Sequence, residues 1–236
     1  SSLAGGFSSM QSTFAAARRV YGFLDEDEMT ADAGEPIPDV KGDVSFNDVC
    51  FSYVPEHPVI RDFSADVKAG QKCAIVGPTG GGKTTLVNLL MRFYEVDSGS
   101  ITLDGKDIRS YSRKDVRSTF QMVLQETWLF SGTVRDNVAY GKENATQAEI
   151  EDACRRARVD DFIRSLPDGY DTVINEESTN ISSGQKQLLT IARAFLADRK
   201  LLILDEATSS VDTRTEVLIQ KSMRELIKGR TSFVIA

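Results

Sequence analysis

The glycine-rich segment Gly77–Thr84, with the sequence GPTGGGKT, restricts the possible folds of this chain more than any other feature. It matches the pattern G-x-x-x-x-G-K-[ST] and lies between an apolar run, KCAIV, and a helix-like run, TLVNLLMRFY. Glycines let the backbone wrap closely around phosphate groups, and the amides that open a helix attract negative charge. The context predicts a phosphate-binding loop rather than a glycine-rich turn with an accidental lysine.

Two adjacent carboxylates, Asp205 and Glu206, follow the apolar run LLIL. Ligands bind at the carboxyl ends of strands in α/β sheets, and neighbouring residues of a strand point in different directions. We expect Asp205 to serve a magnesium ion and Glu206 to polarise an attacking water. Taken alone, LLILDE fits an ordinary strand end with two solvated acids, but the upstream loop favours a Mg-nucleotide site. The absence of an Asn-Lys-x-Asp motif disfavours a GTPase.

Hydrophobic patterns predict an α/β fold. Short alternating runs within residues 43–67 indicate antiparallel strands. The later apolar runs, KCAIV, LLILD and TSFVIA, alternate with helix-like stretches, which is typical of a parallel sheet covered on both faces. Residues of about 111–195 are mostly helical by pattern, so we interpret them as an inserted helical subdomain.

Composition excludes several classes of protein. The 236 residues carry a formal net charge of −7, which argues against a nucleic-acid-binding surface. Cys50, Cys73 and Cys154 lie far apart and form no CxxC pair, so neither a zinc site nor a disulfide framework is indicated. Such cysteines fit a reduced, cytosolic compartment. No apolar run is long enough to span a bilayer.

The N-terminal part differs from the rest. Residues 7–24 form an amphipathic helix by pattern, with apolar side chains spaced by three and four: Phe7, Met10, Phe14, Ala17, Tyr21 and Leu24. Their seam could pack on this chain's own core or on a separate partner. Residues 25–39 contain seven acidic and no basic residues, with two prolines, which predicts a solvated linker and a domain boundary near Lys41.

The segment ISSGQKQLLTIARAFLADRKLLILDEATSSVD, residues 181–212, resembles the signature-to-D-loop region of ABC ATPases. The resemblance runs from about Asp43 to the C-terminus. It implies a P-loop NTPase (RecA-like) core with a parallel sheet, an N-terminal antiparallel β subdomain and an inserted α-helical subdomain. In such a chain, residues 1–24 resemble the cytoplasmic end of the last transmembrane helix, residues 25–40 are a linker and residues 41–236 are the ATPase domain.

The resemblance also implies roles for individual residues. Residues 77–85 become the Walker A loop, Tyr53 stacks on adenine, and Gln125 touches the metal or the attacking water; a core tyrosine and an exposed glutamine are the local alternatives. The implied catalytic residues are Glu206, Lys83 and Gln125, and the implied Mg²⁺ ligands are Thr84, Gln125 and Asp205. The implied ATP-binding residues are Tyr53, Gly77, Pro78, Thr79, Gly80, Gly81, Gly82, Lys83, Thr84, Thr85, Ser182, Ser183, Gly184, Gln185, Ser209 and Asp212.

The stretch ISSGQ corresponds to the family pattern L-S-G-G-Q, with Ser183 in place of the first glycine. Ser182 and the Gly184 amide would bind the γ-phosphate of an ATP held by a second ABC ATPase domain, in a head-to-tail homodimer or heterodimer. Ser182 also fits a plain helix N-cap, which uses the same N–H groups.

Further segments resemble exporters rather than importers. The stretch ETWLFSGTVRDNV contains Trp128, Leu129 and Phe130, which would lie near the groove for the coupling helices of a transmembrane domain, or in the subdomain core. Glu176 resembles the exporters' X-loop glutamate, although Asn175 and Ser178 stand where many members carry glycines.

The implied function is ATP-driven export at the cytoplasmic face of a membrane, of the multidrug type. The family's switch histidine would follow TSFVIA, whereas the single histidine here is His57, so we expect this chain to bind Mg-ATP better than it hydrolyses it. The alternatives are a soluble ABC ATPase of the DNA-repair class and a non-hydrolysing nucleotide sensor. The short separation of Gln125 from Ile181 disfavours the first, and Glu206 disfavours the second.

Overall fold

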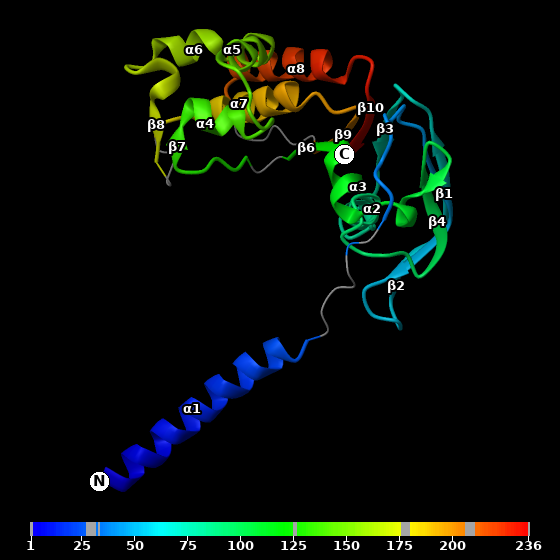
Figure 1. Ribbon diagram of the computed structural model, residues 1–236, viewed down its shortest axis with the longest axis vertical. Coiled ribbons are helices and arrows are strands. Elements are labelled where there is room, and N and C mark those ends of the chain that lie inside the picture. Colours follow the sequence, from blue (N-terminus) through cyan, green and yellow to red (C-terminus); the bar gives the residue numbers. More distant parts are fainter. Residues whose placement is uncertain are drawn as a thin grey trace. The chain divides into compact units, whose positions relative to one another are not determined.

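The computed structural model (Figure 1) describes residues 2–26, 32, 34–124, 127–175, 180–205 and 211–235. The chain divides into two units, Ser1–Ala33 and Gly34–Ala236. Among the described residues, the first unit contains one long helix and the strands lie in the second.

Helix α1 (Ser2–Leu24) lies in the first unit. The seam predicted from the sequence is largely exposed: more than half of the surface of Phe7, Met10, Phe14, Tyr21 and Leu24 is accessible. Within the described residues, no helix combines enough length with enough apolar content to cross a membrane.

An antiparallel sheet opens the second unit. It contains β1 (Val44–Ser52), β2 (Pro58–Val67), β4 (Ser98–Leu103) and β5 (Lys106–Asp107), in the order β2-β1-β4-β5. Strand β1 pairs antiparallel with both β2 and β4, which confirms the strand type predicted for residues 43–67. One face of β1 is buried because its apolar residues alternate with polar ones.

A parallel sheet carries the motifs. It contains β3 (Lys72–Ile75), β10 (Thr231–Ile235), β9 (Leu201–Asp205) and β6 (Phe120–Val123), in the order β3-β10-β9-β6. All three pairings are parallel. Three of these strands coincide with the apolar runs of the sequence. Strand β6 lies inside the range that the sequence assigned to the helical subdomain. The sequence does not predict this strand, because four residues are too few to show a clear hydrophobic pattern.

The parallel sheet separates two hydrophobic cores. Leu201 and Ile203 of β9 face one core, which includes helix α2 (Lys83–Leu90). Leu202 and Leu204 face the other, which includes helices α7 (Ser183–Ala197) and α8 (Thr213–Ile227). Helices α2 and α7 therefore cover opposite faces of the sheet, as Figure 1 shows.

The remaining short elements surround these layers. They are η1 (Ile108–Ser110), α3 (Arg113–Thr119), β7 (Gly132–Thr133), α4 (Val134–Ala139), α5 (Gln147–Arg156), α6 (Asp160–Ser165), η2 (Gly169–Asp171) and β8 (Val173–Ile174). Thr133, Thr146 and Ser182 form capping boxes at the starts of α4, α5 and α7, which fixes where these helices begin.

The end of the acidic segment, residues 34–40, belongs to the second unit and contacts other parts of it, although most of its residues are exposed. The Glu35 amide donates to the Ser110 carbonyl at 3.0 Å, and the Glu35 carboxylate pairs with Lys106. Ile37 and Val40 pack against the core around α2.

Candidate functional site

The loop after β3 has the geometry of a phosphate cradle. Gly80 and Gly82 have φ of 77° and 82°, a left-handed region that favours glycine. A Cβ on Gly82 would also lie 2.8 Å from the Ile60 side chain. Gly82 is the N-cap of α2 and supplies no side-chain hydrogen bond, so the helix begins with amides that can bind an anion.

Lys83 is the first residue of α2, and its ammonium group turns back over the loop. Lys83 Nζ donates to the Gly77 carbonyl at 2.5 Å and more weakly to the Pro78 carbonyl at 3.4 Å. The cation therefore lies inside the curve of the loop, where a phosphate would compete favourably for it because charged acceptors form stronger hydrogen bonds.

Tyr53 follows β1 directly and lies beside the start of α2. Tyr53 Oη and Thr85 Oγ1 share a hydrogen bond of 3.2 Å, and Thr85 is buried in the first turn of the helix. About half of the Tyr53 surface is exposed. The structure thus brings an accessible aromatic ring close to the glycine-rich loop, although Tyr53 follows β1 and the loop follows β3.

Asp205 ends β9, which is separated from β3 by β10 alone. Because these strands are parallel, the loop after β3 and the carboxylate at the end of β9 emerge at the same edge of the sheet. The Thr84 hydroxyl and the Asp205 carboxylate are hard oxygen donors, which suit Mg²⁺. Three further predicted residues, Gln125, Glu206 and Ser209, lie outside the described residues, as do Glu176 and Ser178.

The ISSGQ stretch begins helix α7. Ser182 is the N-cap: its hydroxyl accepts from the Gln185 amide at 3.3 Å, and Gln185 Oε1 accepts from the Ser182 amide at 2.9 Å. The capping interpretation of Ser182 is therefore confirmed. Helix α7 packs on the face of the sheet opposite to α2, so the chain does not gather ISSGQ and the glycine-rich loop into one layer.

Asp212 caps the next helix, α8, and lies near the ISSGQ stretch. Its Oδ1 accepts from the amides of Arg214 and Thr215 at 3.1 and 3.0 Å, and the hydrogen bond from Thr215 lowers the pKa of Asp212. A Cβ on Gly184 would approach Thr215 Cγ2 within 2.4 Å. Gly184 therefore allows the starts of α7 and α8 to meet closely.

An aromatic surface lies next to α4. Leu129 belongs to the core, whereas Trp128 is 64% exposed and contacts the Phe130 ring, with centroids 5.8 Å apart. Two residues that contact this surface, Tyr140 and Arg193, were not identified from the sequence. Tyr140 extends the ring cluster, and the buried Arg193 fixes it by donating to the Trp128 carbonyl at 2.7 Å. Only the fold brings Arg193, which lies on α7, to this segment.

Comparison with known proteins identifies the class. The family model described as ABC transporter matches residues 60–209, which is more than half of the chain. The chain belongs to the ABC transporter family.

Relatives and a solved structure agree with this assignment. The fatty acid ABC transporter ATP-binding/permease protein of Mycobacterium tuberculosis is 56% identical over 236 residues, covering all of this chain and 37% of that protein. An ATP-dependent lipid A-core flippase of Desulfotalea psychrophila is 45% identical over 234 residues, covering 97% of this chain and 40% of its own.

A bacterial Atm1-family ABC exporter with ATP bound is similar in structure, with a TM-score of 0.78 and 35% identity over 96% of this chain and 40% of the exporter. The chain thus spans about two fifths of the length of the relatives that it matches. The ABC ATPase fold predicted from the sequence is confirmed.

Proposed function

We propose that this chain is the ATP-binding and ATP-hydrolysing domain of an ABC exporter. The observation that carries the proposal is that the glycine-rich loop, followed by helix α2 without a side-chain cap, emerges at the same sheet edge as Asp205. The named relatives are transporters, which supports export over the DNA-repair class of ABC ATPases. One of them transports fatty acids and another flips lipid A-core, so a lipid-like substrate is favoured for the whole transporter.

Each predicted residue has a proposed role in nucleotide binding. The amides of residues 77–85 and the Lys83 ammonium hold the phosphates, and Tyr53 stacks on the adenine. Thr84, Asp205 and Gln125 would hold Mg²⁺, which neutralises charge on the phosphates when it is bound. Glu206 orients and deprotonates the attacking water.

A second copy of the site is required to complete the first. The α7 N-terminus, with Ser182, Ser183, Gly184 and Gln185, would bind the γ-phosphate held by a partner domain, and Ser209 and Asp212 would line the same interface. The position of α7 on the sheet face opposite to α2 supports this arrangement, because one chain does not unite both halves in one layer.

Two other regions would connect the domain to the membrane. The exposed Trp128, with Phe130 and Tyr140, would receive the coupling helices of a transmembrane domain. Helix α1 would continue the last membrane-spanning helix, and residues 25–40 would join it to the ATPase domain of residues 41–236, with its helical subdomain at about 111–195. This connection would hold the domain at the cytoplasmic face of the membrane.

Nucleotide binding and turnover by three forms of the chain test the proposal. Wild type should bind Mg-ATP, Lys83→Ala should lose most of that affinity, and Glu206→Gln should retain it while turnover falls at least about 100-fold, the usual contribution of a general base. Equal ATP binding by wild type and Lys83→Ala would refute the assignment of the loop. We further propose that the 236 residues turn ATP over weakly. Their single histidine, His57, lies in the turn between β1 and β2 and does not match the family's switch histidine. Equal rates for Glu206→Gln and wild type would instead favour a nucleotide sensor.

A further inference from the structure

Tyr94 lies in the turn after helix α2 and contacts the proposed adenine-binding ring. The Tyr94 and Tyr53 ring centroids are 5.1 Å apart, with the ring planes at 88°. We propose that Tyr94 is a positioning residue that holds Tyr53 in the orientation needed to stack on a nucleotide base. This role rests on the proposed stacking of Tyr53 on adenine.

The two tyrosines belong to a closed group of three rings. The Phe51 ring centroid lies 4.9 Å from that of Tyr53, with the ring planes at 86°, and 5.6 Å from that of Tyr94, with the planes at 54°. Phe51 is part of the hydrophobic core, whereas Tyr53 and Tyr94 are each nearly half exposed. The two contacts of Tyr53 are edge-to-face, a favourable arrangement, and they restrict how its ring can rotate while leaving part of its surface open.

The Tyr53 hydroxyl provides a third restraint, from the other end of the side chain. Its hydrogen bond to Thr85 ties the ring to the first turn of α2, next to the loop that would hold the phosphates. The ring is therefore fixed at its edge by Tyr94 and Phe51 and at its hydroxyl by Thr85. A base-binding ring fixed in advance loses less conformational freedom when the ligand binds.

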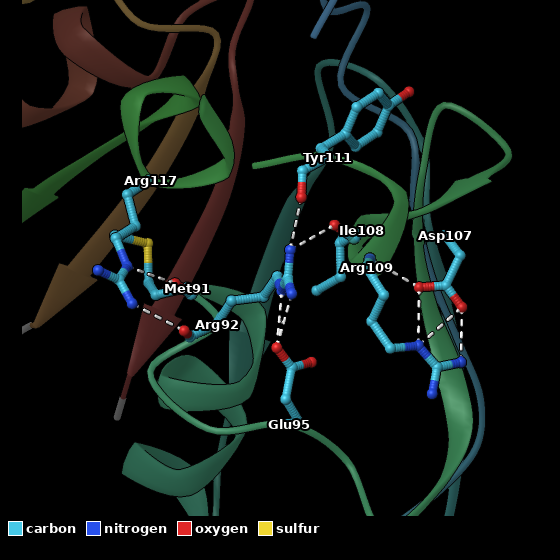
Figure 2. Close-up of polar contacts among 8 residues, drawn as sticks. All are labelled: Met91, Arg92, Glu95, Asp107, Ile108, Arg109, Tyr111 and Arg117. Carbon is cyan, nitrogen blue, oxygen red and sulfur yellow. Dashed lines mark hydrogen bonds and ion pairs between the residues drawn. The ribbon is translucent and has the colours of Figure 1, made fainter. Parts of the chain in front are cut away.

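The turn that carries Tyr94 is itself held by charged hydrogen bonds (Figure 2). Arg92 is buried and donates from Nη1 to the carbonyls of Ile108 and Tyr111, at 3.1 and 2.7 Å. Its Nε and Nη2 both donate to Glu95 Oε1, at 3.1 and 2.6 Å. Arg92 and Glu95 thereby close the turn on either side of Tyr94.

Arg117 of α3 fastens the same turn from a second element. Its Nε and Nη2 donate to the carbonyls of Met91 and Arg92, at 3.2 and 2.9 Å (Figure 2). The Arg117 guanidinium also lies over the Phe93 ring, 4.8 Å from its centroid. These contacts make the turn a rigid support, which is what a positioning residue requires.

The matched variants are Tyr94→Leu, Tyr94→Phe and Phe93→Leu. Phe93 is the neighbour of Tyr94 and is equally exposed, but it stacks on Arg117, so its replacement controls for any disturbance of the turn. The probes are Mg-ATP and inorganic tripolyphosphate, which carries the phosphates without a base. Affinities are measured by calorimetric titration of the 236-residue chain.

Tyr94→Leu should weaken ATP binding roughly threefold to tenfold, the range that one aromatic contact supports, and leave tripolyphosphate binding unchanged. Tyr94→Phe and Phe93→Leu should bind both probes like wild type. Wild-type ATP affinity in Tyr94→Leu would overturn the proposal, as would an equal loss for both probes, because that result indicates a damaged phosphate loop.

A double-mutant cycle separates positioning from a merely structural effect. In a Tyr53→Leu background, Tyr94→Leu should cause no further loss of ATP affinity, because its effect passes through the Tyr53 ring. Additive losses would contradict the positioning role. If wild type binds ATP no better than tripolyphosphate and Tyr53→Leu changes neither affinity, the stacking role of Tyr53 fails first, which distinguishes the two proposals.

Discussion

Replacing Gly184 with alanine tests why the ISSGQ stretch carries a glycine. The added Cβ would lie 2.4 Å from Thr215 Cγ2 and 2.7 Å from Val211 Cγ1, about 1 Å short of ordinary van der Waals contact with the nearer atom. Both neighbours are branched at Cβ and cannot swing away freely. Overpacking of this kind costs about 1–3 kcal/mol. Alanine regains at most about 1 kcal/mol through its higher helix propensity.

Taking the middle of the overpacking range, about 2 kcal/mol, less at most about 1 kcal/mol, we expect a loss of about 1–2 kcal/mol in the free energy of unfolding. For a chain of this size, that loss lowers the melting temperature by about 2–8 °C, which scanning calorimetry resolves. Thr215→Ser removes the nearest methyl group while keeping the hydroxyl, so the double variant Gly184→Ala, Thr215→Ser should recover part of the loss. An unchanged or higher melting temperature for Gly184→Ala would refute the packing argument and leave phosphate binding as the sole reason for the glycine.

Three further predictions concern stability and reactivity. Arg92→Met leaves the Tyr111 carbonyl without its Arg92 donor, whereas the Ile108 carbonyl keeps its hydrogen bond from the Tyr111 amide. The substitution should lower the free energy of unfolding by about 1–3 kcal/mol in urea, and a loss well below 1 kcal/mol would contradict the role of Arg92. A hydrogen bond from Lys142, and others from Thr146, lower the pKa of Glu149 to about 2, so the stabilisation by Glu149 is complete above its ordinary pKa of 4.5 and is lost as the pH falls towards 2. The stability difference between wild type and Glu149→Gln should shrink over that window, and a constant difference would count against the prediction. Burial raises the pKa of the Cys154 thiol to about 12, so iodoacetamide should label the half-buried Cys50 and Cys73 before Cys154 in the folded chain, as peptide mass spectrometry can check.

The sequence predicted those parts of the fold that local patterns encode. The alternating residues of β1 predict an antiparallel strand, and the continuous apolar runs of β9 and β10 predict buried parallel strands. The glycines before Lys83 predict the conformation of the loop. Strand β6 was not recognised because four residues are too few for a period, and its strand state depends on pairing with β9.

Contacts between distant segments could not be read from the sequence. The residues around Tyr94 in the sequence do not indicate that its ring contacts Tyr53. Likewise, the sequence around Arg193 does not indicate that its side chain donates to the Trp128 carbonyl. Ile37 and Val40 give little signal among acidic neighbours, yet they pack against the core around α2. Such contacts arise from the packing of whole elements, which local patterns do not determine.

The central claim is that one chain supplies the phosphate loop and another supplies the ISSGQ helix. Mixing two variants tests it most directly: Lys83→Ala, which impairs the loop, and Ser183→Glu, which places a negative charge at the exposed first residue of α7. An acidic residue at this position is compatible with the helix but repels a phosphate.

The measurement is light scattering of each variant and of their mixture in saturating Mg-ATP. Each variant alone should remain monomeric, whereas the mixture should form dimers, because one of the two shared sites then combines an intact loop with an intact ISSGQ helix. A mixture that stays monomeric while wild type dimerises would contradict the claim that the two halves come from different chains.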